Sequence, residues 1–376
     1  MTVDNPSQVQ VSPLTSPQRA SFLTSLSTLQ LLAVLLVVVC HLWQRFLPCD
    51  KDVGVPYLAG LAVSFCFVYS GFFTARGGRF TDSYTLSDHG RYLMMKLSRF
   101  YPMYVVALLM CYVAFGGFSV KPFLVSMAML NPFVPVRSYY FGANAVGWFL
   151  CAMMFIYLVS PWVVRWLGRL AVRWQMLLLA LLLVLQVLGG YFELLDSYLL
   201  YQFPPMRVID FATGVVLYNL TCTATYARWQ SRLTSRRATG VEWAAVLLAI
   251  PLCWLGCRVH DLWCFRAWCT MVAPVCLLLG AFVFTSASGG WLSRMLSARL
   301  FRTFSRFSSE IYIFQIAVYF CLVPWLDRLG MGHNSLSFIA IQWAALFVFS
   351  WMFHELVTRR SERLLRSWQA GRRVAR

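Results

Sequence analysis

The sequence predicts an all-α fold: a polytopic integral membrane protein with about ten transmembrane helices. Of the 376 residues, 60% are hydrophobic and only 12% are charged. The apolar residues form runs near twenty residues long, which is the length that crosses a bilayer core at ~1.5 Å rise per residue. Because these runs are continuous rather than alternating, a β-barrel is excluded, and helices remain the way to satisfy the backbone in lipid.

Ten apolar segments are expected to be the spans, in order along the chain. They are 29–47, 57–75, 101–118, 146–167, 175–192, 207–223, 242–258, 267–286, 309–327 and 336–357. A further apolar piece at 122–135 is too short to span, so it is expected at the interface or as a re-entrant segment. The chain then divides into a disordered cytoplasmic tail at 1–26, a transmembrane domain at 27–358 and a basic cytoplasmic tail at 359–376.

A net charge of +18 could indicate a protein that binds nucleic acid, but the distribution of the basic residues along the chain argues against that function. Of the 32 Lys and Arg residues, 24 lie in alternate connections, beginning with the N-terminal tail. This alternation is the positive-inside pattern. It predicts that both termini are cytoplasmic, that the number of spans is even, and that the partners of the chain include membrane lipids rather than nucleic acid. The host membrane, plasma membrane or endomembrane, is left open.

The twelve cysteines do not indicate a metal site. They are scattered, mostly within the spans, where a cysteine acts as a small apolar side chain. No set of His and Cys residues has the spacing of zinc ligands, so no metal is expected.

His41 lies inside the first span, at the end of an apolar run. If the helix runs outward from Leu29, His41 lies ~18 Å along it, in the outer half of the membrane. A polar group in lipid must be paired or face a cavity. Two interpretations stay open: a neutral imidazole hydrogen-bonded to a neighbouring helix, or a general base that takes a proton from a hydroxyl.

Six stretches, one in each of six spans, carry a family resemblance. They are "LQLLAVLLVVVCH" (29–41), "FVYSGFFTA" (67–75), "KLSRFYPMY" (96–104), "GWFLCAMMFIYLVSPWV" (147–163), "RVIDFATGVVLY" (207–218) and "FSSEIYIFQIAVY" (307–319). In this order they resemble the motifs of the acyltransferase-3 family of membrane acyltransferases, over roughly residues 28–366. The resemblance implies ten helices and transfer of an acyl group, often acetyl, from cytoplasmic acyl-CoA to a hydroxyl of a glycan or a lipid-linked sugar.

The resemblance also implies site residues. His41 matches the catalytic His that ends the first motif of the family. The chain departs from the pattern at three positions: Gln30 replaces an Arg, Met153 or Met154 replaces a Glu, and Gln315 replaces a second His. Gln30 and Gln315 are expected near the donor site nonetheless. Acyl-CoA is the expected donor substrate, with no permanently bound cofactor.

Asp210 is the best candidate for a carboxylate that orients His41, because it too is predicted in the outer half of the membrane. The alternative is a local ion pair with Arg207, three residues earlier on the same helix. The two readings are weighed evenly.

Three cations just before the third span are candidates for the phosphates of coenzyme A: Arg91, Lys96 and Arg99. The alternative is ordinary positive-inside placement or contact with lipid headgroups, which the sequence alone favours. Ser70, beside a glycine, is expected where a pantetheine arm passes close to helix 2. Such an arm needs a tunnel between spans 1, 2, 3 and 9.

Two other functions remain open. Ten helices with His, Asp and Gln inside the membrane also suit a secondary transporter or carrier. Loss of three polar family residues also suits a non-catalytic relative that binds an acyl donor or lipid.

Overall fold

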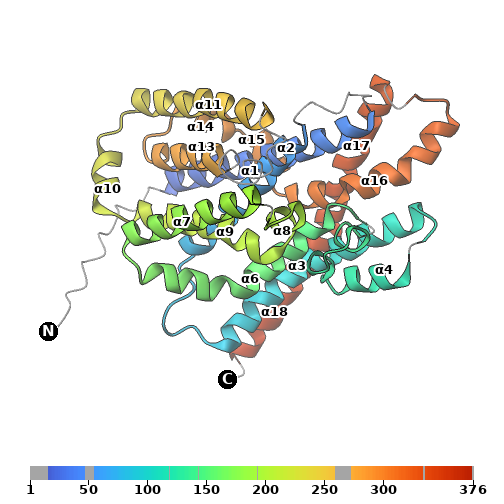
Figure 1. Ribbon diagram of the computed structural model, residues 1–376, viewed down its shortest axis with the longest axis horizontal. Helices are drawn as coiled ribbons and strands as arrows, with labels where there is room; N and C mark the ends of the chain where they lie inside the picture. The colour runs from blue at the N-terminus through green and yellow to red at the C-terminus, as the bar shows by residue number, and fades with distance from the viewer. Residues whose placement is uncertain are drawn as a thin grey trace.

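The computed structural model describes residues 16–46, 55–117, 119–142, 144–192, 194–258, 272–332 and 335–374. The described residues are almost entirely helical and contain no β-strand (Figure 1). The long helices are α1 (Ser16–Phe46), α2 (Val55–Arg76), α3 (Leu86–Ala114), α6 (Gly147–Gly168), α7 (Val172–Tyr191), α9 (Pro204–Thr221), α11 (Ser235–Arg258), α13 (Val272–Thr285), α16 (Ser308–Arg328), α17 (Leu336–Phe353) and α18 (Arg359–Val374). Shorter helices are α4 (Val120–Met127), α5 (Arg137–Tyr140), α8 (Ser197–Tyr201), α10 (Ala224–Ser231), α14 (Trp291–Leu296) and α15 (Arg299–Ser305), with a 3-10 turn at Asn131–Phe133 and a π-helical turn at His354–Thr358.

Each of the ten predicted spans overlaps a helix, and residues 47, 118 and 267–271 of those predictions lie outside the described residues. Within the described residues, eight helices are long and apolar enough to cross a membrane, and α8, α9 and α10 together form a further candidate that bends by 68° before α10. Helix α13 is a shorter apolar helix of 14 residues. A multi-pass helical membrane protein is therefore confirmed, while the count of ten and the cytoplasmic position of both termini remain predictions.

The N-terminal boundary was predicted wrongly. Residues 16–26 were expected to belong to a disordered tail, but they form the first turns of α1. The polar composition hid two helix-forming features. Pro17 stands in the first turn, where its missing N–H is not needed. Leu26 is fully buried in a cluster with Val275 and Leu279 of α13, so this end of α1 is held by packing.

The apolar piece at 122–135 does not span, as expected: it folds as α4, a turn and the short 3-10 segment. The predicted C-terminal tail forms helix α18, which contacts α3 through an Arg99–Glu362 ion pair of 3.5 Å.

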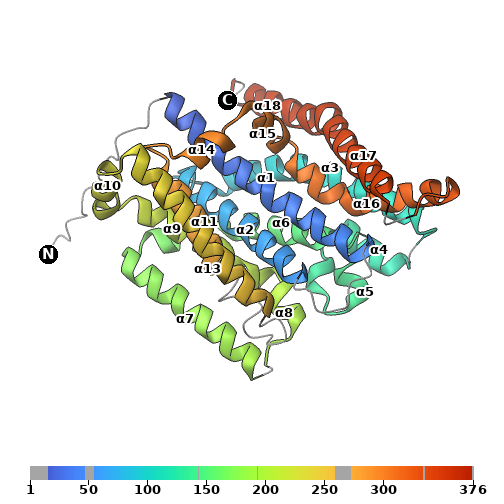
Figure 2. The same ribbon diagram turned by 90° about the horizontal axis from the view of Figure 1, so that it is seen from above.

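Helices α1 and α2 occupy the middle of the bundle, with α11 and α13 on one side and α16 and α17 on the other (Figure 2). Helices α2 and α9 approach each other closely, because glycines stand at their crossing. A Cβ at Gly71 of α2 would overlap the carbonyl oxygen of Phe211, and one at Gly214 of α9 would overlap that of Val68. Small residues allow such backbone contact between membrane helices. This contact aligns Ser70 with the site described below.

Replacing Gly71 by Ala is expected to lower stability by about 1–3 kcal/mol, because the added methyl meets backbone that cannot move aside. The matched control is Gly90→Ala in α3, where a Cβ meets nothing within 4 Å. That change should be neutral or stabilising, since Ala is about 0.8–1 kcal/mol better than Gly within a helix. Thermal unfolding of the purified protein in detergent measures both. Equal melting temperatures for the two variants would contradict the packing argument.

Candidate active site

A cavity of about 300 Å³ lies among five helices, α1, α2, α3, α6 and α16. Four of them are the helices between which the donor tunnel was expected, and α6 forms an additional wall. The walls consist of Gln30, Val34, Cys66, Tyr69, Ser70, Phe73, Thr74, Gly77, Arg79, Phe80, Tyr92, Lys96, Phe100, Phe149, Leu150, Met153, Tyr157, Ser309 and Tyr312.

One end of the cavity is cationic and aromatic. Lys96 of α3 places its Nζ 4.1 Å from the centre of the Tyr157 ring and 5.5 Å from that of Tyr92. Ser70 Oγ donates a hydrogen bond of 3.3 Å to the Tyr157 hydroxyl. Arg79, from the connection between α2 and α3, lines the same end. Two cations at a mouth with hydroxyl groups suit an anionic ligand.

The connection that carries Arg79 is fixed on both sides. Arg165 of α6 donates to the carbonyl oxygens of Thr81 and Tyr84 at 2.8 and 3.0 Å. Helix α3 begins directly afterwards with a capping box, in which Thr85 and Asp88 satisfy each other's backbone N–H groups. Burial, followed by the nearby Asp88 carboxylate, raises the pKa of Tyr84, so its phenol stays protonated at neutral pH.

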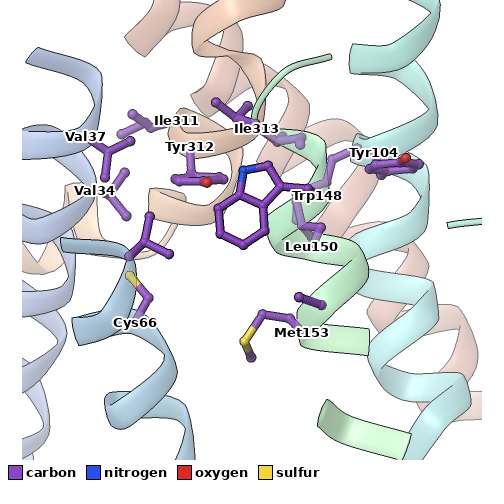
Figure 3. Close-up of a cluster of buried hydrophobic side chains, with 14 of the residues drawn as sticks. Val34, Val37, Cys66, Tyr104, Trp148, Leu150, Met153, Ile311, Tyr312 and Ile313 are labelled. Carbon is purple, nitrogen blue, oxygen red and sulfur yellow. The ribbon is translucent and has the colours of Figure 1, made fainter. Parts of the chain in front are cut away.

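The other end of the cavity is apolar. In Figure 3, Met153 extends from α6 toward the side of α2, which carries Cys66, and Val34 on α1 and Tyr312 on α16 lie above these two residues. The Tyr312 ring packs against the Phe149 ring, and the centres of the two rings are 4.8 Å apart. Met153 occupies one of the two positions where the family resemblance leads one to expect a carboxylate, so this wall offers no charge.

His41 lies beyond this apolar end and does not line the cavity. It is seven residues past Val34 on α1, or ~10 Å along the helix. Its Nδ1 lies 3.0 Å from Oε1 of Gln315, whose Nε2 donates to the carbonyl oxygen of Tyr312 at 2.8 Å. Gln315 is 1% exposed, whereas His41 is half-buried. A hydrogen-bonded chain therefore links the cavity wall at Tyr312 to the imidazole.

Asp210 pairs with Arg207, as the alternative reading proposed. Arg207 Nη1 lies 2.9 Å from Asp210 Oδ2, and both side chains are at most 1% exposed. Ser64 bridges them, donating to Asp210 at 3.4 Å and accepting from Arg207 Nη2 at 3.3 Å. Pro204 and Pro205 begin α9 and set this register. An orienting role of Asp210 toward His41 stays a prediction.

The other residues expected at the donor site separate into two groups. Gln30, Ser70 and Lys96 line the cavity. Arg91 instead faces Asp88 at 3.6 Å, and Arg99 faces Glu362 at 3.5 Å, so neither is a wall residue.

Sequence reasoning missed Arg79, which was counted only among the topological charges. The signal that could have found it is the preceding Gly77-Gly78 pair. Gly78 has a φ of +57°, and this left-handed turn ends α2 and carries the chain past the cavity mouth.

Comparison with known proteins identifies a family and a related acyltransferase. The family described as an acyltransferase domain, acyltransferase-3, matches residues 23–354. The acyltransferase MdmB of Streptomyces mycarofaciens is 25% identical over 261 residues, which cover 62% of this chain and 64% of that protein. The chain therefore aligns with slightly less than two thirds of that relative. No solved structure matches significantly. Because the family match runs from the first spanning helix to the last, the chain belongs to the acyltransferase-3 family.

Proposed function

We propose that this protein transfers an acyl group, acetyl in the first instance, from cytoplasmic acyl-CoA to a hydroxyl of a glycan or lipid-linked acceptor, with His41 as the general base. The observation that carries the proposal is the cavity, which is cationic at one end and approaches the hydrogen-bonded pair of Gln315 and His41 at the other. The cationic end lies at the connection between α2 and α3 and the first turns of α3, a segment that the positive-inside pattern assigns to the cytoplasm.

The donor fits the cavity by its chemistry. Coenzyme A combines phosphate groups with a long, thin pantetheine arm. Arg79 and Lys96 would meet the phosphates, and the arm would run past Ser70 toward Met153 and Tyr312. The acyl end must then pass the Tyr312 ring to reach His41.

The reaction requires one proton to move from the acceptor hydroxyl to His41 and then from His41 to the leaving thiolate. His41 takes the proton of the acceptor hydroxyl as its oxygen attacks the thioester carbonyl carbon. The carbon–sulfur bond breaks, and the leaving thiolate receives the proton from the imidazolium. The products are the acyl ester and free coenzyme A. A half-buried imidazole beside an amide oxygen suits this task, because the imidazolium is stabilised when it forms.

Removing a cation at the cavity mouth is expected to weaken donor binding. Lys96→Met and Arg79→Met should each raise the KM for acetyl-CoA about tenfold or more, since hydrogen bonds to charged groups contribute ~1.5–3 kcal/mol. Steady-state kinetics with radiolabelled acetyl-CoA measures this. Arg91→Met is the matched control, because Arg91 is a nearby cation outside the cavity wall, and its KM should change less than about twofold. Equal effects at all three positions would indicate general surface charge rather than a donor site.

The test of the function is acyl transfer by purified protein in vesicles. Labelled acetyl-CoA is supplied on one side, together with extracted glycan or lipid-linked sugars, and labelled ester is measured. The proposal is supported if the wild-type protein forms labelled ester and the His41→Ala variant does not. Absence of ester with every donor, combined with passage of a substrate across the vesicle, would favour the carrier.

A further inference from the structure

We propose that Gln315 is a positioning residue that fixes the tautomer of His41, placing the proton on Nδ1 and the basic lone pair on Nε2. This inference rests on the proposed function, in which His41 is the base. It goes further by naming the nitrogen that accepts the proton from the acceptor hydroxyl and the residue that selects it.

The orientation of the Gln315 amide depends on a group that cannot donate a hydrogen bond. The carbonyl oxygen of Tyr312 is only an acceptor, and it lies 2.8 Å from one end of the Gln315 amide. That end must therefore be the NH₂ group. With the side chain 1% exposed on α16, the reversed amide would press two oxygens together without water between them. The orientation of the amide is thus set by the backbone of its own helix.

The orientation of the Gln315 amide determines which nitrogen of His41 carries the hydrogen. With the NH₂ end committed to Tyr312, the other end is the oxygen Oε1, which faces Nδ1 of His41 at 3.0 Å. An amide oxygen only accepts, so Nδ1 must carry the hydrogen. In the neutral imidazole the lone pair is then on Nε2.

This arrangement serves both halves of the reaction. Nε2 takes the proton from the hydroxyl, and Nδ1–H keeps its bond to Oε1 while the ring is positively charged. Nε2 later returns the proton to the thiolate. Since the amide is uncharged and cannot take the proton away from Nδ1, the ring keeps one catalytic nitrogen throughout. A wrong tautomer at a catalytic histidine is known to be costly in a hydrolase triad.

The direct test is nitrogen NMR of the full-length protein labelled with ¹⁵N-histidine, in detergent or nanodiscs, with the His41 signals assigned by their loss in His41→Gln. In the neutral ring, Nε2 couples to both carbon-bound ring protons and Nδ1 strongly to one. We expect the protonated-type shift on Nδ1 and the unprotonated-type shift on Nε2. The reverse assignment, or an average of the two, would overturn the inference, and this readout requires no change at Gln315.

Kinetics supplies the second readout. Gln315→Leu should lower kcat about 10–100-fold with little change in the KM for acetyl-CoA. Gln315→Glu should recover most of the loss as the protonated acid, whose hydroxyl can donate to the Tyr312 carbonyl oxygen while its carbonyl oxygen accepts from Nδ1–H. A Leu variant that keeps the wild-type shifts and kcat would overturn the inference. Failure of the proposed function is distinguishable, because it would appear as full transfer by His41→Ala or as no ester from the wild-type protein, whatever the tautomer.

Discussion

The His41→Ala variant is expected to lose 10²–10⁴-fold in kcat for acyl transfer, about the contribution of a positioned general base. The physical reason is that no other imidazole is described near Gln315, so nothing else there can take the proton of the hydroxyl at neutral pH. Binding of acetyl-CoA should persist, because His41 lies outside the cavity wall. Single-turnover transfer measures the loss, and calorimetry of acetyl-CoA binding measures what is retained.

His89→Gln is the matched control for this experiment. His89 is also a buried histidine of the bundle, but its Nδ1 contacts the Tyr84 hydroxyl at 3.2 Å and it is not in the cavity wall. Its replacement should leave kcat within a fewfold of wild type. If both variants lost activity together with donor binding, the effect would be one of folding, and the role of His41 as a base would have to be abandoned.

The positions of the helices could be predicted from the sequence because the membrane imposes a simple rule on length and polarity. This rule failed at the start of α1. Residues 16–26 have the polar composition of a solvent-exposed segment, but they are helical, and Leu26 packs against α13. That contact joins residues far apart in the chain, so the composition of the N-terminal segment does not predict it.

The candidate site was predictable as a list of polar residues, but its arrangement was not. Lys96 and Arg99 are neighbours on α3 and were treated alike. Lys96 lies over Tyr157 at the cavity, whereas Arg99 faces Glu362 of α18. Which cation faces a ligand depends on where the C-terminal helix packs. Gln315 was expected at the donor site, and the structure places it beside His41 through the packing of α16 on α1.

The Asp210→Leu variant should destabilise the protein by roughly 3–5 kcal/mol, because it leaves the guanidinium of Arg207 buried without a counter-charge. Arg207 is 1% exposed and lies 5.1 and 5.0 Å from the Phe67 and Tyr201 rings, so it cannot reach water by a simple rotation. Reduced yield in detergent extracts and a lower melting temperature measure the effect. A stable Asp210→Leu protein would show that water or lipid headgroups reach this pair.

The double variant Arg207→Met/Asp210→Leu separates the two roles weighed for Asp210. Removing both charges removes the unpaired ion, and Met can retain the stacking on Phe67 and Tyr201, so stability should return to within about 1–2 kcal/mol of wild type. If the carboxylate serves Arg207 alone, acyl transfer returns with the fold. If it also orients His41, the double variant folds but transfers slowly, with normal binding of acetyl-CoA. The structure favours the first outcome, because the contacts it gives to Asp210 are those with Arg207 and Ser64, while the Nδ1 side of His41 is held by Gln315.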